Sequence, residues 1–182
     1  KMKNTEFKKC KKLIHQHFEN LTQNQQKFIP KKSRIPLAIP PYGSKEVTES
    51  LESLMKMQTT SGEKVRKFEK KFSKYVGSKY GTMVNSGSSA NLLALSILSN
   101  PLLKNRIKPG DEIITPAVTW ATTVYPISNI NAIPRLVDVK LDDYTIDPDS
   151  IEKAINNKTK AIMIVHLLGN PCDMKKIVKI AK

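Results

Sequence analysis

Apolar residues recur along most of this chain at the spacing of amphipathic helices and short buried strands. An amphipathic helix places apolar side chains three or four positions apart, whereas a buried strand is a short continuous apolar run. The two patterns predict helices over residues 5–28, 44–57, 63–76, 119–130, 149–155 and about 172–182, and strands over residues 81–84, 112–115, 135–139 and 159–165. Within residues 85–98 they predict a tight loop that leads into one more helix.

From residue 81 onwards the predicted strands and helices alternate. Strands that are separated by helices favour a parallel or mostly parallel sheet with right-handed crossovers. The fold class that the pattern predicts for this part of the chain is therefore α/β.

Several residues that break regular structure precede this region. We expect a helical leader over residues 1–35, and an extended arm that joins it to a main domain over residues 36–182. The residues that mark this boundary are Pro30, Pro36, Pro40, Pro41 and Gly43.

The composition fits one substantial core. The chain has 182 residues, of which 39% are hydrophobic, and this is enough for one domain and a tail. No apolar run approaches the ~18 to 20 residues of a membrane-spanning helix, and the start of the chain lacks the apolar block of a signal peptide. Cys10 and Cys172 lie far apart in unrelated contexts, so we expect a reduced, cytoplasmic protein. No bound metal is expected.

Basic residues exceed acidic residues, and about half of the excess lies in the leader. The chain carries 31 Lys and Arg against 16 Asp and Glu, a formal net charge of +15. Such a leader could contact nucleic acid or an anionic membrane. Its cations are nearly all lysines in a Gln- and Asn-rich setting, which is typical of a solvated face, so neither partner is expected. The leader's basic residues are Lys1, Lys3, Lys8, Lys9, Lys11, Lys12, Lys27, Lys31, Lys32 and Arg34.

The stretch over residues 85–98 leads from small polar residues into a helix. The first N–H groups of a helix lack partners inside the helix, and the helix dipole adds positive charge there. Ser88 and Ser89 would add hydroxyl donors, and Gly87 would let the backbone approach a phosphate closely. The residues alone leave a second interpretation open, because Ser86 or Ser88 could simply cap the helix and the stretch matches neither the Walker nor the dinucleotide fingerprint.

Ligands of parallel sheets lie beyond the carboxyl ends of the strands. The loops that follow three of the predicted strands would approach one crevice, which brings Ser88, Trp120 and His166 within reach of a single ligand. On local pattern alone, Trp120 could also be a partly buried core residue and His166 a structural histidine.

Several motifs in a fixed order carry a family resemblance from about residue 35 to residue 182. They are MVNSGSSANLL (83–93), PGDEII (109–114), PAVTWATT (116–123), VDV (137–139) with YTID (144–147), and LLGNP (167–171). With these motifs the chain resembles the DegT/DnrJ/EryC1/StrS family of nucleotide-sugar aminotransferases and dehydratases, which use pyridoxal phosphate. The resemblance implies the N-terminal part of a large domain of the aspartate-aminotransferase fold (fold type I), with three α/β/α layers and a mostly parallel sheet.

The resemblance also implies a cofactor site for pyridoxal 5′-phosphate or pyridoxamine 5′-phosphate. Gly87, Ser88 and Ser89 would hold the cofactor phosphate at the start of the helix. Trp120 matches the aromatic residue that stacks on the pyridine ring, since an indole offers a large flat face. His166 lies where relatives carry His or Asn, and would contact the ring or its 3-oxygen.

Further residues are implied for the substrate and for catalysis. Thr60 and Gly62 match a loop that in relatives approaches the nucleotide sugar, often across a dimer interface, which implies a homodimer. The aspartate that pairs with the pyridine nitrogen, and the lysine or histidine that transfers protons, would lie beyond Lys182. The chain would then hold half a cofactor site and be inactive alone.

Within the family the chain resembles most closely the 3-dehydratases that act on nucleotide-linked 4-keto-6-deoxy sugars. The residues that carry this resemblance are Asn91 to Leu93, residues 120–123 and residues 168–171. We therefore expect dehydration at C3 during synthesis of surface-polysaccharide (O-antigen, lipopolysaccharide) sugars. A nucleotide-sugar aminotransferase is the alternative, because the missing catalytic position decides between the two reactions. The basic leader leaves open a second alternative, a non-catalytic binding or scaffold relative.

Overall fold

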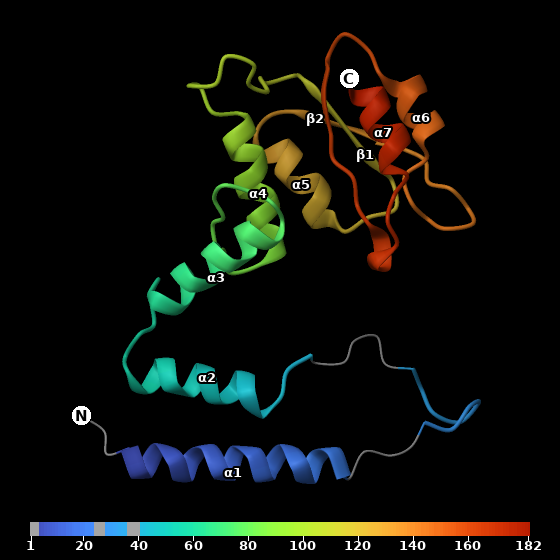
Figure 1. Ribbon diagram of the computed structural model, residues 1–182. Helices are drawn as coiled ribbons and strands as arrows, with labels where there is room; N and C mark the ends of the chain where they lie inside the picture. Colours follow the sequence, from blue (N-terminus) through green and yellow to red (C-terminus); the bar gives the residue numbers. More distant parts are fainter. Residues whose placement is uncertain (1–3, 24–27, 36–40) are drawn as a thin grey trace. The chain divides into compact units, whose positions relative to one another are not determined.

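The computed structural model describes residues 4–23, 28–35 and 41–182 (Figure 1). Contacts divide the chain into two compact units, Lys1–Met83 and Val84–Lys182, which are described separately below. Pro36 and Pro40 of the expected arm lie outside the described residues, as do residues 24–27 of the first predicted helix. The predicted domain boundary after residue 35 stays a prediction.

The described part of the first unit is helical. It contains α1 (Asn4–Gln23), α2 (Ser44–Met55) and α3 (Glu63–Tyr75). Helix α2 begins after Gly43, whose N–H donates to the Glu46 carboxylate at 2.8 Å, and α1 packs against α2. Among its described residues only Thr48 and Ser73 are buried, so the unit has no buried apolar side chain there.

The second unit is an α/β fold around a parallel three-stranded sheet. Strand β1 (Glu112–Pro116) lies between β2 (Ile133–Val137) and β3 (Thr159–Ile162), and both neighbours run parallel to it. The connecting elements are the helices α4 (Gly87–Leu98), α5 (Ala121–Asn129), α6 (Pro148–Ala154) and α7 (Met174–Ala181), with the short 3-10 turn η1 (Leu167–Gly169).

Two apolar clusters cover the two faces of this sheet, which gives three layers. Successive side chains of a strand point to opposite faces. Accordingly Ile113 packs in one cluster with Leu95 of α4 and Ile127 of α5, while its neighbour Ile114 packs in the other. The second cluster includes Ile151 of α6 and Ile177 of α7, and its other members are Val137, Ile146 and Cys172. The predicted fold class is therefore confirmed.

The strand predicted over residues 81–84 is wrong for the described structure. Residues 81–84 do not pair with any other strand that the structure describes, and the Met83 N–H donates instead to the Glu69 side chain at 2.9 Å. An apolar run becomes a strand only where a neighbouring strand takes its backbone hydrogen bonds. The sequence pattern contains the run but not the partner.

Strand β3 is shorter than the predicted run of residues 159–165 because of Pro116. The Met163 N–H donates to the Ile114 carbonyl at 2.8 Å, and the next bond of a parallel ladder would need the N–H of Pro116. Proline has none, so the ladder ends at Ile162. Strand β2 likewise lies two residues earlier than predicted, since Val139 pairs with Ile146 in an isolated bridge instead of following β1.

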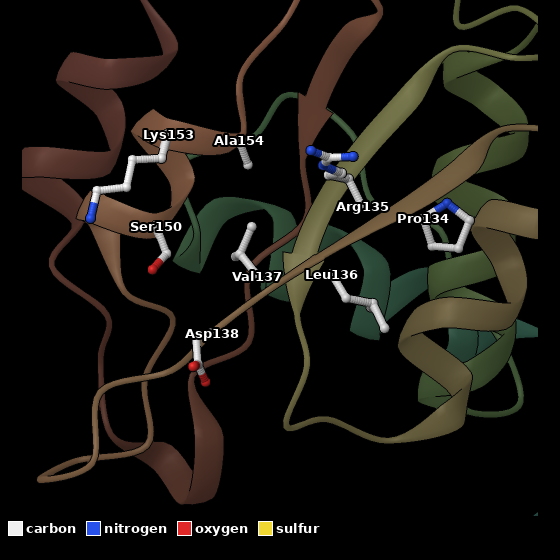
Figure 2. A pocket seen from close by; sticks show the side chains of 8 residues that line it. All are labelled: Pro134, Arg135, Leu136, Val137, Asp138, Ser150, Lys153 and Ala154. Carbon is white, nitrogen blue, oxygen red and sulfur yellow. The ribbon is translucent and has the colours of Figure 1, made fainter.

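The outer edge of β2 is closed to further pairing at one position. Ile133 and Val137 direct their backbone groups toward β1, so Pro134 lies at an outward position, where its missing N–H prevents another strand from binding there. A hollow of about 540 Å³ lies beside this edge and is lined by residues of β2 and α6. Figure 2 shows the side chains that line it. None of the predicted site residues lines that hollow.

Candidate functional site

At the start of α4, one backbone N–H group is capped by a side chain and two others have no partner among the described residues. Ser86 is the cap, because its Oγ accepts the Ser89 N–H at 3.2 Å. The Ser89 hydroxyl donates to Asn85 Oδ1 at 2.6 Å. The capping interpretation is therefore confirmed for Ser86, whereas the Ser88 hydroxyl and the N–H groups of Gly87 and Ser88 have no hydrogen-bond partner among the described residues.

These unpaired donors fit an oxyanion. A Cβ added at Gly87 would meet no atom within 4 Å, so the space in front of the first helical turn is open. Unpaired N–H groups, the positive end of the helix dipole and a free hydroxyl together make an anion-binding position. The residues present therefore fit the phosphate of the expected cofactor, with Ser88 better placed to donate than Ser89.

A shallow hollow of about 240 Å³ lies beside this helix start, between α4 and α5. Asn91 of α4 holds the two helices together, because its Nδ2 donates to the Thr122 carbonyl at 3.2 Å. That carbonyl lies four residues before Pro126, which has no N–H to give it. The sequence placed Asn91 in a motif but did not reveal this role. The hollow is lined by Ser88, Ser89, Leu92, Thr122, Tyr125, Pro126 and Asn129.

Trp120 caps the start of α5 and presents its ring to solvent. Its carbonyl accepts the Thr123 N–H at 2.9 Å, and Thr119 and Thr123 join their hydroxyls at 2.8 Å. The side chain is 76% exposed, so the alternative of a partly buried core tryptophan is wrong. An exposed indole face is available for stacking on a flat ring.

His166 follows β3 and is fixed on one side. The Cys172 N–H donates to its Nδ1 at 3.1 Å, and the ring is exposed. The backbone between them turns sharply, since Leu168 and Gly169 have φ values of 53° and 82°. A neutral ring with Nδ1 as acceptor carries its hydrogen on Nε2, which leaves an N–H to donate outward. His166 is thus both structurally anchored and able to contact a ligand.

The topology brings three of the predicted positions to one edge of the sheet. Figure 1 shows α4 and α5 side by side, both starting near the end at which β1 leads into α5. Because β1 and β3 are parallel, the His166 turn lies at this edge too. Ser88 and Ser89 line the hollow described above, while Trp120 and His166 do not.

Thr60 and Gly62 belong to the first unit, so their place relative to Ser88 is not defined. Thr60 is exposed. Gly62 precedes α3, and its carbonyl accepts the Arg66 N–H at 3.2 Å. Their part in substrate binding stays a prediction.

Asp147, a carboxyl with a lowered pKa, lies outside this site. The Ser150 hydroxyl donates to Asp147 at 2.7 Å and holds the pKa of that carboxyl below its usual range, with help from two N–H groups at the start of α6. This is a helix cap.

Within the described residues there is no group of three His, Cys, Asp or Glu side chains that could hold a metal, and no helix there is long and apolar enough to cross a membrane.

The second unit thus has the form of a parallel α/β domain in which a helix start with unpaired N–H groups lies at the carboxyl edge of the sheet. The model of the DegT/DnrJ/EryC1/StrS aminotransferase family matches residues 41–182. The chain belongs to this family, and the predicted family resemblance is confirmed.

Curated and solved relatives agree with this membership. The chain is 43% identical over 147 residues to a GDP-4-keto-6-deoxy-D-mannose 3-dehydratase of Yersinia pseudotuberculosis, a match that covers 81% of this chain and 37% of that protein. The structure of the E. coli GDP-4-keto-6-deoxy-D-mannose-3-dehydratase with bound hydrated PLP matches with a TM-score of 0.74 at 40% identity, over 81% of this chain and 38% of that one.

An aminotransferase relative matches almost as well. The PMP-form of a putative sugar aminotransferase of Streptococcus pneumoniae gives a TM-score of 0.71 at 32% identity, over 81% of this chain and 36% of that one. The chain is thus a partial match to 3-dehydratases and a putative sugar aminotransferase, and it spans well under half the length of these relatives. The two solved relatives hold PLP or PMP.

Proposed function

We propose that this chain is the N-terminal portion of an enzyme that removes the C3 hydroxyl from a nucleotide-linked 4-keto-6-deoxy sugar with the help of pyridoxal or pyridoxamine phosphate. The observation that carries the proposal is the unpaired start of α4, at Gly87 and Ser88. Among the solved relatives, the identity of 40% to the 3-dehydratase, against 32% to the sugar aminotransferase, favours dehydration. Surface-polysaccharide sugar synthesis in the cytoplasm is the corresponding role.

The residues of this chain would bind and orient the cofactor. The N–H groups of Gly87 and Ser88 and the Ser88 hydroxyl would hold its phosphate, and Ser89 would position this loop through Asn85. The exposed face of Trp120 would pack on the ring, and the outward N–H of His166 would donate to an oxygen on it. When bound, the cofactor supplies an electron sink for a carbanion next to the reacting carbon.

Cofactor binding can be tested on this chain, because Trp120 is its single tryptophan. We expect pyridoxal phosphate to quench the fluorescence of Trp120 saturably, and pyridoxal without the phosphate to bind much more weakly. Replacing Ser88 by Ala removes one hydrogen bond, worth about 1 kcal/mol, and should weaken binding about fivefold. Ser96→Ala in the same helix is the matched control. Equal quenching by both compounds, unchanged in the Ser88 variant, would contradict the phosphate site.

An activity assay that distinguishes a dehydratase from an aminotransferase requires the complete gene product, purified from the cells that naturally produce it. We would incubate it with pyridoxal phosphate, glutamate and GDP-4-keto-6-deoxymannose, and follow the sugar by mass spectrometry. Loss of the C3 oxygen supports dehydration, whereas an amine in place of the 4-keto oxygen supports the aminotransferase alternative. If the protein neither binds the cofactor nor consumes the sugar, the non-catalytic scaffold alternative is favoured.

A homodimer is part of the proposal, because Thr60 and Gly62 match a loop that in relatives contacts substrate across a dimer interface. Analytical ultracentrifugation over a range of protein concentrations tests this directly. A species with the mass of a single chain at every concentration would contradict it.

A further inference from the structure

A second concave site lies at the opposite edge of the sheet, where β1 and β3 begin. It is a cavity of about 550 Å³ formed by the loop between α4 and β1 together with the second residue of β3. We call it the basic pocket. Its lining residues are Lys104, Asn105, Arg106, Lys108, Asp111 and Lys160.

The basic pocket carries an excess of positive charge that nothing else in the described structure neutralises. Its four cations have no acidic partner within 4.0 Å among the described residues, whereas five other lysines do. Its one acid, Asp111, accepts the Lys108 N–H at 2.7 Å and thereby stabilises the turn. Four cations that line one cavity beside a single engaged carboxylate favour a multiply charged anion.

The backbone of the basic pocket is held in place before any ligand arrives. Ile107, between two of the cations, is 5% exposed and packs against the α4 and α5 side of the sheet. Its N–H donates to the Leu98 carbonyl at 2.9 Å, and the Gly110 N–H donates to the Asn131 carbonyl at 2.8 Å. A site that is already ordered loses less entropy on binding.

Lys160 enters the basic pocket through a break in the sheet register. Glu112 pairs with Thr159, but Ile113 pairs with Ala161, so Lys160 is an extra residue in β3. Such a bulge turns the side chain out of the regular alternation of a strand, and bulges commonly re-aim residues at binding sites. Here the bulge adds the fourth cation to three that come from one loop.

We propose that the basic pocket binds a compact polyphosphate. Arg106 offers the planar fork that pairs with phosphate oxygens, and the lysines add point charges. The lining contains no aromatic side chain, so it lacks the stacking surface on which single-stranded nucleic acids bind. A concave volume of this size suits a small ligand rather than a strand. The proposal is independent of the cofactor site, which lies at the other edge of the sheet.

The test uses the whole chain with sodium tripolyphosphate as the probe. Isothermal titration gives the affinity, and amide NMR spectra locate the site. We expect shifts at residues 104–111 and at Lys160, and a loss of affinity of about tenfold in the Arg106→Gln, Lys160→Gln double variant. The control is Lys175→Gln, Lys179→Gln on α7, which changes the net charge equally and should cost less than about twofold.

Three results would overturn the proposal. Equal weakening in both double variants would mean that only the net charge attracts the probe. Shifts at Ser88, without shifts at residues 104–111, would assign the probe to the helix start. An oligonucleotide of matched charge that binds more tightly than tripolyphosphate would identify a nucleic-acid surface instead. The wild-type NMR spectra give this answer even if the double variant fails to fold.

Discussion

Two buried threonines of the second unit differ in whether their hydroxyl has a partner. Thr115 is fully buried, and its Oγ1 has no partner among the described residues, whereas Thr145 donates its Oγ1 to Asp143 at 2.7 Å. A buried unpaired hydroxyl costs about 1 to 3 kcal/mol. We expect Thr115→Val to raise the free energy of unfolding by about 1 kcal/mol, and Thr145→Val to lower it by about the same amount.

Urea unfolding followed by far-UV circular dichroism measures both variants. The two substitutions are chemically identical, so the difference between them isolates the hydrogen bond. If Thr115→Val is as destabilising as Thr145→Val, the Thr115 hydroxyl has a partner in solution.

The tautomer of His166 is a second prediction at the residue scale. The Cys172 N–H occupies Nδ1, so the neutral ring should carry its hydrogen on Nε2. Long-range ¹H–¹⁵N NMR distinguishes the two tautomers. His15 is the internal control, because its Nδ1 faces the Ser44 hydroxyl at 2.8 Å, and a hydroxyl can donate or accept. A hydrogen on Nδ1 of His166 would contradict the anchoring of the ring.

At this scale the sequence predicted the candidates but not their hydrogen bonds. Ser88, Trp120 and His166 were identified from motifs, and the structure brings their segments to one edge of the sheet. The sequence could not predict that Ser86 caps α4 while the Ser88 hydroxyl stays unpaired, because either hydroxyl could cap the helix. Likewise the partner of His166 depends on how the chain turns through Leu168 and Gly169.

The contact between α4 and α5 gives a prediction at the scale of elements. Pro126 leaves the Thr122 carbonyl without its helical donor, and Asn91 supplies one. We expect Asn91→Ala to lower the free energy of unfolding by about 1 kcal/mol, since a partly buried carbonyl loses its partner. In a Pro126→Ala background the helix can supply its own N–H, so the same substitution should cost clearly less.

A double-mutant cycle from urea unfolding measures this coupling. We expect an interaction energy of about 1 kcal/mol. Equal costs of Asn91→Ala in both backgrounds would mean that the Asn91 side chain does not serve the carbonyl that Pro126 leaves free.

Periodicity predicted the helices well and the strand limits less well. The helices α2, α3, α5 and α6 begin and end within about two residues of the predicted ranges, because an apolar stripe is a property of one helix alone. A strand depends also on its neighbour. Pro116 ends β3 across the sheet, and residues 81–84 lack a pairing strand in the described structure, and neither effect is visible in the run itself.

Buried apolar side chains are distributed unevenly between the two units. The buried apolar side chains of the described structure lie between Leu95 and Ile177, in the second unit. In the first unit Phe68 and Phe72 stack with ring centroids 5.6 Å apart but remain about half exposed. The sequence predicted an apolar face on this helix; what covers such a face is not encoded in its spacing.

This contrast predicts unequal stability within one chain. Local opening is easiest where few apolar side chains are buried, so the backbone amides of α2 and α3 should exchange at least about a hundredfold faster than those of β1. Hydrogen–deuterium exchange with mass spectrometry measures both in one experiment, and α5, which packs in the core of the second unit, is the control for a well-covered helix. If α3 is as protected as β1, its aromatic face is covered in solution. A protection that grows with protein concentration would identify the cover as a second copy of the chain, which is the arrangement that the proposed homodimer requires.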